Sequence, residues 1–285
     1  MQGSFEKTVL EADFPFRLFF NPEYISTPHH WHEDVEIIYV VEGKVKVGIS
    51  NDIYELNLGD ILFIGSGAVH CFFNEREASK RAVIQFKISI YDTFYSGNKD
   101  TKTMRPSLSK SMHLTAGTEI HGLMEKQIQQ LIKEYSEAKE GYKLFIKGRL
   151  YDLAGILLRY MPKGSYSKEA ESHQKEKLKK LDKVFQYVEK NYGDSIHLEE
   201  ISRVAGFSKY YFTRFFKELT GVTFSHYLNN FRIAKAEWFL LYDKESILEV
   251  SYKSGFNSIK TFNRVFKASK GCAPLEYRNG VRHAT

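Results

Sequence analysis

The chain has 285 residues, of which 42% are hydrophobic and 27% are charged, and its net charge is +6. This length is typical of roughly two globular domains, and the sequence excludes a membrane-spanning helix because it contains no run of about eighteen apolar residues. No basic segment followed by a long apolar stretch stands at the amino terminus, so we expect a cytoplasmic protein. Two distant cysteines, Cys71 and Cys272, build no disulfide framework, in agreement with a reducing compartment.

The positive charge is concentrated in the back half of the chain. From His173 onward there are 20 Lys and Arg residues against 12 Asp and Glu residues, a balance of +8, whereas residues 1–172 carry 21 against 23, a balance of −2. A basic half joined to a near-neutral half indicates a polyanionic partner for the back half alone. A solvated basic surface without a partner is the alternative that charge leaves open.

The first 95 residues carry the pattern of short β-strands. Residues 44–50 alternate polar and apolar side chains, as a half-buried strand does, and turn residues flank them. Similar segments follow at short intervals, so we predict an antiparallel sandwich or small barrel over residues 1–95. The predicted strands are Val35–Val41, Lys44–Ser50, Tyr54–Leu58, Ile61–Ile64, Cys71–Phe73 and Ala82–Ile88.

Residues 96–161 combine an aperiodic polar stretch with two amphipathic segments. We predict a loop up to residue 117, followed by helices over Thr118–Glu140 and Tyr142–Tyr160, where apolar residues recur at helical spacing. These apolar stripes either cover the barrel or associate with a second chain, so that a homodimer is expected. The residues expected at the association face are Leu131, Leu150, Leu153 and Leu157.

Residues 162–177 are polar and are predicted to be a linker, and residues 178–285 are helical and contain an internal repeat. The segment Ile201–Phe207 matches Val250–Phe256 at an offset of 49, and after one inserted residue the match resumes at an offset of 50, where Arg214 meets Arg264. One supersecondary unit is therefore used twice. Each copy predicts a helix, a turn at a glycine and a second helix, which is the helix-turn-helix arrangement.

The second helix of each copy has two different faces. Its Phe residues recur at helical spacing and are predicted to be core. The opposite face carries side chains suited to the major groove, where Arg and Lys donate to guanine and Asn pairs with adenine. The predicted base contacts are Lys209, Tyr210, Thr213, Arg214, Ile259, Lys260, Asn263 and Arg264. The predicted phosphate contacts are Ser208, Lys217, Ser258 and Lys267.

This back segment, about residues 185–280, closely resembles the AraC/XylS family of bacterial transcription regulators. The resemblance covers both repeat copies, the connecting helix Phe224–Tyr242 and the signature stretch Gly255–Pro274. Phe224 stands where the first copy of the family commonly has Pro. The resemblance implies two recognition helices held on one face by a long central helix, entering successive major grooves about 34 Å apart.

Two stretches of the front half resemble the motifs of the cupin barrel, HxHx3Ex6G and Gx5PxGx2Hx3N. They run from His30 to Gly43 and from Gly59 to Asn74, with Gly65 at the usual Pro position. His30, His32 and Glu36 share strand parity, so their side chains are expected to point to one face. His70 is expected to join them from a second strand. Three imidazoles and a carboxylate suit Zn, Mn, Fe or Ni, so a divalent metal is one expectation for His30, His32, Glu36 and His70.

Regulators with an AraC-type tail often have a cupin-like sensor whose mouth binds a small effector, commonly a sugar. Directed hydrogen-bonding groups and one aromatic face suit such a ligand. The expected effector-binding residues are Arg17, Tyr24, His30, Trp31, His32, Glu36 and His70. Two alternatives stay open: a metal-dependent cupin enzyme fused to a DNA-binding domain, and partly buried histidines that bind no ligand.

We therefore predict an α+β protein with a cupin-like sensor barrel, a two-helix self-association segment and an all-α double helix-turn-helix domain. It is expected to be a transcription regulator, an activator rather than an enzyme, that requires no cofactor. Its expected partners are double-stranded DNA, a small effector, a second copy of itself and RNA polymerase, with no membrane.

Overall fold

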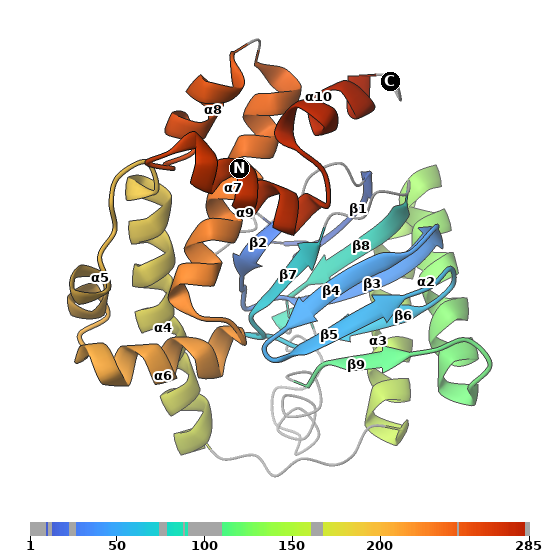
Figure 1. Ribbon diagram of the computed structural model, residues 1–285. Coiled ribbons are helices and arrows are strands. Elements are labelled where there is room, and N and C mark those ends of the chain that lie inside the picture. Colours follow the sequence, from blue (N-terminus) through green and yellow to red (C-terminus); the bar gives the residue numbers. More distant parts are fainter. Residues whose placement is uncertain are drawn as a thin grey trace.

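The computed structural model describes residues 10, 13–22, 27–73, 79–87, 89–90, 110–160, 168–243 and 245–282. Two β-sheets lie at the centre of Figure 1, with two long helices on one side and the helical back half on the other. None of the helices in these ranges is long and apolar enough to cross a membrane.

The two sheets are entirely antiparallel and together form the predicted cupin-like unit. One sheet has the strand order β1-β8-β3-β6-β9, and the other has the order β2-β7-β4-β5. Apolar side chains of both sheets, among them Ile38, Val47 and Leu62, form one core between them. The strands are β1 (Phe16–Pro22), β2 (Thr27–His30), β3 (Val35–Glu42), β4 (Val45–Ile49), β5 (Asp52–Leu56), β6 (Ile61–Ile64), β7 (His70–Phe73), β8 (Lys80–Phe86) and β9 (Met112–Leu114).

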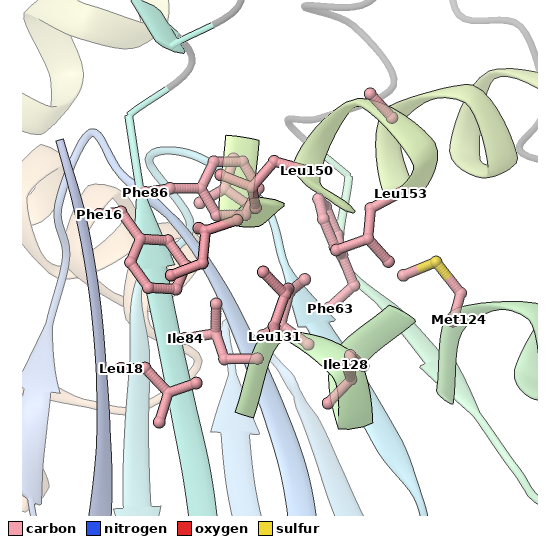
Figure 2. Close-up of a cluster of buried hydrophobic side chains, with 14 of the residues drawn as sticks. Phe16, Leu18, Phe63, Ile84, Phe86, Met124, Ile128, Leu131, Leu150 and Leu153 are labelled. Atoms are coloured by element: carbon pink, nitrogen blue, oxygen red, sulfur yellow. The ribbon is translucent and has the colours of Figure 1, made fainter. Parts of the chain in front are cut away.

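Helices α2 (Glu119–Glu137) and α3 (Tyr142–Tyr160) cover the outer face of the five-stranded sheet. Figure 2 shows Leu131, Leu150 and Leu153 of the two helices directed at side chains of the strands, among them Phe63, Ile84 and Phe86. The side chains expected at a dimer interface are at most 1% exposed in the single chain, so the proposed association face is wrong. These buried residues are Leu131, Leu150, Leu153 and Leu157.

Two predicted connections are more ordered than expected. Strand β9 lies inside the segment predicted to be a loop, where it pairs with β6. The predicted linker is helical from Lys168 onward, because α4 (Lys168–Asn191) begins there. Residues 172–176 of this helix are exposed, and burial of apolar residues in its described part begins at Leu178. A solvated helix and a linker have the same composition, which is why the sequence did not separate them.

The back half repeats one unit, as predicted. The first unit has α5 (Leu198–Val204) and α6 (Lys209–Thr220), and the second has α8 (Ile247–Lys253) and α9 (Ile259–Lys270). Helix α7 (Phe224–Tyr242) joins them, and α10 (Pro274–Arg282) follows the second. Gly206 and Gly255 adopt φ angles of 72° and 87° at the turns, a conformation that glycine tolerates without strain.

Candidate nucleic-acid interface and barrel ligand site

Helices α6 and α9 separate core from surface as the repeat predicts. Phe212 and Phe216 are buried in the first unit, and Phe262 and Phe266 are buried in the second. All of the predicted base-contacting side chains are exposed on the opposite faces, namely Lys209, Tyr210, Thr213, Arg214, Ile259, Lys260, Asn263 and Arg264. Each unit therefore presents an exposed helix face, and the buried Phe residues behind that face are arranged in the same way in both units.

The predicted phosphate contacts lie at the two ends of these helices. Ser208 and Ser258 are the N-caps, and their hydroxyl oxygens accept hydrogen bonds from the backbone N–H groups of Tyr211 and Thr261. Lys217 and Lys267 are exposed in the last turn of α6 and α9. A cation in the last turn also favours the helix dipole, so a structural role for these lysines accompanies any role at DNA.

One end of the barrel holds a compact histidine cluster. One ring nitrogen from each of His30, His32 and His70 lies within 4.8 Å of the others. The rings are buried, with exposures of 5%, 2% and 0%, and the centroids of the His30 and His70 rings are 4.1 Å apart. Strands β2 and β7 position two of them directly opposite each other, because His30 is the register partner of His70.

The tautomer of each clustered imidazole follows from its second hydrogen bond. The Nδ1 atoms of His30, His32 and His70 each lie 2.9 Å from a backbone carbonyl oxygen, those of Pro28, Asp34 and Ala68. A carbonyl only accepts, so each Nδ1 carries the proton and donates. In a neutral ring the lone pair then resides on Nε2, which is the arrangement seen in metal-ligating histidines and is open to His30 and His70. His32 differs, because its Nε2 atom also faces an acceptor, Oε2 of Glu36 at 3.0 Å, so that both of its ring nitrogens donate and the ring is protonated while this bond is made.

Glu36 completes the cluster from the other sheet. Its Oε2 atom is 3.0 Å from Nε2 of His32 and 3.8 Å from Nε2 of His70. Burial alone raises the pKa of this carboxyl, but the hydrogen bond from His32 and the charges of His70 and His32 outweigh it and lower the pKa to about 2. Burial lowers the pKa of His70 to about 4. Near neutral pH, an anionic carboxylate therefore faces a neutral imidazole.

Comparison with known proteins identifies one known domain type in each half of the chain. Residues 201–280 match the family model of a helix-turn-helix domain, and residues 16–86 match that of a cupin domain. The chain is 25% identical over 258 residues to the uncharacterized HTH-type transcriptional regulator YdeC of Bacillus subtilis, covering 88% of this chain and 86% of that protein. It is 25% identical to the regulator SAS0078 of Staphylococcus aureus over 84% of this chain, but spans only 31% of that longer protein.

The chain carries an AraC-type helix-turn-helix domain and a cupin domain, and it is similar to HTH-type transcriptional regulators. The resemblance to AraC-type regulators with a cupin-like domain is thereby confirmed. The relatives are transcriptional regulators rather than enzymes, as expected. Among solved structures, ToxT from Vibrio cholerae aligns over 93% of the regulator and 98% of its own chain, with 16% identity and a TM-score of 0.47. The DNA-binding domain of AdpA, solved with a target DNA, aligns over 35% of the regulator and 91% of its own chain, with 26% identity and a TM-score of 0.35.

The regulator brings most of its predicted barrel residues together, but by a different route. Glu36 belongs to β3 of the five-stranded sheet, whereas His30 ends β2 of the other sheet. They meet because the chain bends at Glu33 and Asp34 between the two strands, and not because they share the parity of one strand. The motif spacing was therefore informative, while its simplest geometrical explanation was wrong.

Sequence reasoning missed Gln85 in the regulator's site. Its Nε2 atom donates to Oε2 of Glu36 at 2.5 Å, and its Oε1 atom accepts from Nε of Arg17 at 2.5 Å. Arg17 is thus one hydrogen-bonded step from the cluster rather than in it. The available signal was a polar side chain in the apolar run of β8, where Gln85 is only 1% exposed.

Two other predicted effector residues stand apart from the cluster. Trp31 is 6% exposed and belongs to the apolar core that the first helix-turn-helix unit shares with α4, whose Leu181 and Phe185 are part of it. This placement does not support stacking of Trp31 on a sugar inside the barrel. Tyr24 lies outside the described residues. The two cysteines are free, with Cys71 buried and Cys272 half-buried.

Proposed function

We propose that this regulator recognises specific DNA sequences with α6 and α9, and that a ligand held by the barrel's histidine cluster controls it. The repeated exposed faces and the basic back half support DNA recognition. The buried histidine cluster supports ligand control, because the described barrel has no other group of this composition within such short distances. The regulator would act in the cytoplasm and would activate transcription through RNA polymerase.

The cluster fits a divalent transition-metal ion because it holds more hydrogen-bond acceptors than donors. The Nε2 atom of His70 and the Oε1 atom of Glu36 are buried and have no hydrogen-bond partner among the described residues. A metal ion with a preference for imidazole nitrogen and carboxylate oxygen satisfies such acceptors. His30, His32 and His70 would hold it with Glu36, and the bound ion would supply a positive charge that links β2, β7 and β3.

A sugar is the second effector chemistry, as the family resemblance implies. Hydroxyl groups can donate to the same Nε2 and carboxylate acceptors. The apolar platform that a sugar ring needs is the weaker part of this alternative, because Trp31 packs against the first helix-turn-helix unit. A metal ion needs no such platform, so we favour the ion.

Metal titration of the full chain tests the ligand. Purified protein stripped by a chelator is titrated with Zn²⁺, Mn²⁺, Fe²⁺ and Ni²⁺ by calorimetry, and bound metal is measured by elemental analysis. We expect one ion per chain in the wild type and its loss in His70→Ala. His113→Ala is the matched control, because His113 contacts Asp60 at 3.2 Å and lies outside the cluster. No stoichiometric ion, with binding of a sugar instead, would overturn the metal proposal.

DNA recognition is tested separately. Selection of binding sites from random duplexes should give two short motifs about one helical turn apart, since two recognition helices would enter successive grooves. Binding that shows no sequence preference would contradict this part of the proposal, whatever the barrel binds.

A homodimer remains part of the proposal, with a different surface from the one predicted. Leu144 and Phe145 at the start of α3 are 74% and 55% exposed. Replacing both with Glu should convert a dimer into a folded monomer, measured by sedimentation velocity. A wild-type chain that is monomeric at micromolar concentration would exclude this dimer.

A further inference from the structure

Strand β2 and the residues after it face two ways. The side chains of His30 and His32 enter the barrel cluster, while those of the alternating residues His29 and Trp31 face the back half of the chain. The His29 ring lies 6.0 Å from the ring of Tyr227 on α7, and its exposure is 5%. Trp31 belongs to the same apolar core as Tyr227. One short segment therefore forms part of the ligand site and part of a domain contact.

His70, the third histidine of the cluster, also adjoins the contact with the back half of the chain. Val69, next to His70, packs into the core of the first helix-turn-helix unit. Gly67, two residues earlier, approaches α4 so closely that a Cβ atom there would lie 3.1 Å from Leu178. Every histidine of the cluster thus directly adjoins, in sequence, a residue buried against the first unit. The ligand cluster and this domain contact are therefore built from the same strands.

A second contact joins the barrel to recognition helix α6 itself. Gly221, which ends α6, lies against the turn between β4 and β5, where a Cβ atom would stand 1.7 Å from the carbonyl oxygen of Ser50. Beside this contact, Asn51 of the turn lines a surface hollow together with Arg214, Lys217 and Glu218 of α6. Two of the predicted DNA-contacting side chains therefore share their surroundings with the barrel.

The second unit lacks these contacts in the described part of the chain. Its core contains Ile233, Leu240, Phe256, Phe262 and Phe266, with no barrel residue. Strand β2 packs on α7, and the shared core extends along α7 only as far as Phe231. The barrel is docked onto one of the two repeated units and leaves the other to α7.

We propose that the barrel ligand regulates the first helix-turn-helix unit by releasing this docked contact, while the second unit binds DNA in either state. The inference rests on the proposed ligand site. In the docked form the β4–β5 turn occupies space beside Arg214 and Lys217, where a DNA backbone would approach. Ligand binding at the histidines rearranges β2 and β7, which weakens the contact of Trp31 and Val69 with the first unit. A ligand shifts this equilibrium only by its preference for the undocked form.

Thermodynamic linkage makes the proposal measurable without knowing the target DNA. If the ligand favours undocking, any change that weakens docking must tighten ligand binding, by at most the ligand's preference for the undocked form. Gly221→Ala places a methyl group against Ser50 and should wedge the contact apart. Gly271→Ala is the matched control, because Gly271 ends α9 with φ 71° against 77° for Gly221, and both cap N–H groups bond to a lysine carbonyl four residues earlier.

The experiment is a Zn²⁺ competition titration of the full chain with a chromophoric chelator. We expect Gly221→Ala to bind Zn²⁺ on the order of fivefold more tightly or better, the lower range of allosteric coupling, and Gly271→Ala to bind as the wild type does. Equal Zn²⁺ affinity in all three proteins would overturn the coupling. Failure of the wild type to bind Zn²⁺ at the cluster would instead remove the ligand proposal on which the coupling rests.

A second pair of variants guards against poor folding of Gly221→Ala. Asn51→Arg sets a positive charge against Arg214 and Lys217, and should also tighten Zn²⁺ binding. Asn57→Arg carries the same charge at the other end of β5 and should not. Footprinting on a selected duplex supplies the second readout: Zn²⁺ should extend protection from one groove to two. Protection of both grooves without the ion, unchanged on its addition, would overturn the release mechanism.

Discussion

The two helix-turn-helix units share one local design and differ in what surrounds it. Both have a serine N-cap, a left-handed glycine at the end of the recognition helix and two buried Phe residues one turn apart. The first unit shares its core with Trp31 and Val69 of the barrel, whereas the second closes its core within the back half. The repeated sequence therefore determines the local structure of each unit. Contacts outside the repeat determine which unit the barrel ligand would regulate.

Cavity substitutions in the two cores probe this comparison most strongly. Phe216→Ala and Phe266→Ala remove matched side chains that are fully buried, so each should lower the free energy of unfolding by about 3–5 kcal/mol. Chemical denaturation monitored by tryptophan fluorescence measures both, since Trp31 lies in the first core and Trp238 on α7. Phe216→Ala should also change Zn²⁺ affinity, and Phe266→Ala should not. An equal change of Zn²⁺ affinity in both variants would break the comparison.

The second unit replaces the barrel contact with a buried ion pair. Nζ of Lys270, at the end of α9, lies 2.8 Å from Oε1 of Glu237 on α7, and the Tyr277 hydroxyl donates to the same oxygen at 2.9 Å. The equivalent position in the first unit is Thr220, whose buried hydroxyl donates to the carbonyl of Phe216. The same helix end is therefore anchored by charge in one unit and by a neutral hydrogen bond beside the barrel in the other.

Removing these two anchors should have unequal effects. Lys270→Met leaves the carboxylate of Glu237 buried without its cation, which costs about 3 kcal/mol or more of unfolding free energy. Thr220→Val removes the neutral hydrogen bonds of this hydroxyl, which donates to the carbonyl of Phe216 and accepts from the N–H of Val222, at about 1 kcal/mol each. Thermal unfolding of the two variants measures the difference. A smaller loss for Lys270→Met than for Thr220→Val would show that the ion pair does not hold the second unit together.

The sequence predicted the repeated unit better than its environment, for physical reasons. Periodic Phe residues and glycines that need positive φ are local signals, so the helices around Arg214 and Arg264 were placed correctly. The polar start of α4 and the isolated strand β9 carry no such periodicity. The contact that the sequence failed most clearly to predict is the one made by the second face of β2. His29 and Trp31 pack with α7 across about 200 residues of chain, and no nearby residue in the sequence identifies that partner.

The candidate ligand site was likewise predictable where its residues form a local motif, and not where they meet through the strand order of the sheet. His30, His32, Glu36 and His70 stand at a recognisable spacing, and they do converge. Gln85 joins them only because β8 lies between β1 and β3 in the sheet, which is a matter of strand order rather than of local pattern. Trp31 has the composition of a sugar platform, but strand alternation directs it out of the barrel.

Base contacts should be of equal strength in the two units once both are free. Arg214→Ala and Arg264→Ala should each lose about 1–3 kcal/mol of specific DNA binding, the value of one good base contact. Quantitative footprinting with the ligand present measures each half-site. In the absence of ligand, Arg264→Ala should still weaken binding, while Arg214→Ala should have little effect because the first unit is docked. Loss of equal size in both states for both variants would separate DNA binding from the barrel.

The matched lysines give the smallest effect and the finest test of the comparison. Lys217 and Lys267 end equivalent helices and are both exposed, but only Lys217 lines the hollow that contains Asn51 of the barrel. Loss of one phosphate contact reduces the slope of log affinity against log salt concentration by about 1. Lys267→Ala should show this reduction with and without ligand, whereas Lys217→Ala should show it only with ligand. Fluorescence anisotropy at a series of salt concentrations measures both slopes. A ligand-independent reduction for Lys217→Ala would mean that the barrel turn and DNA occupy that surface together, and that the docked contact does not obstruct the first unit.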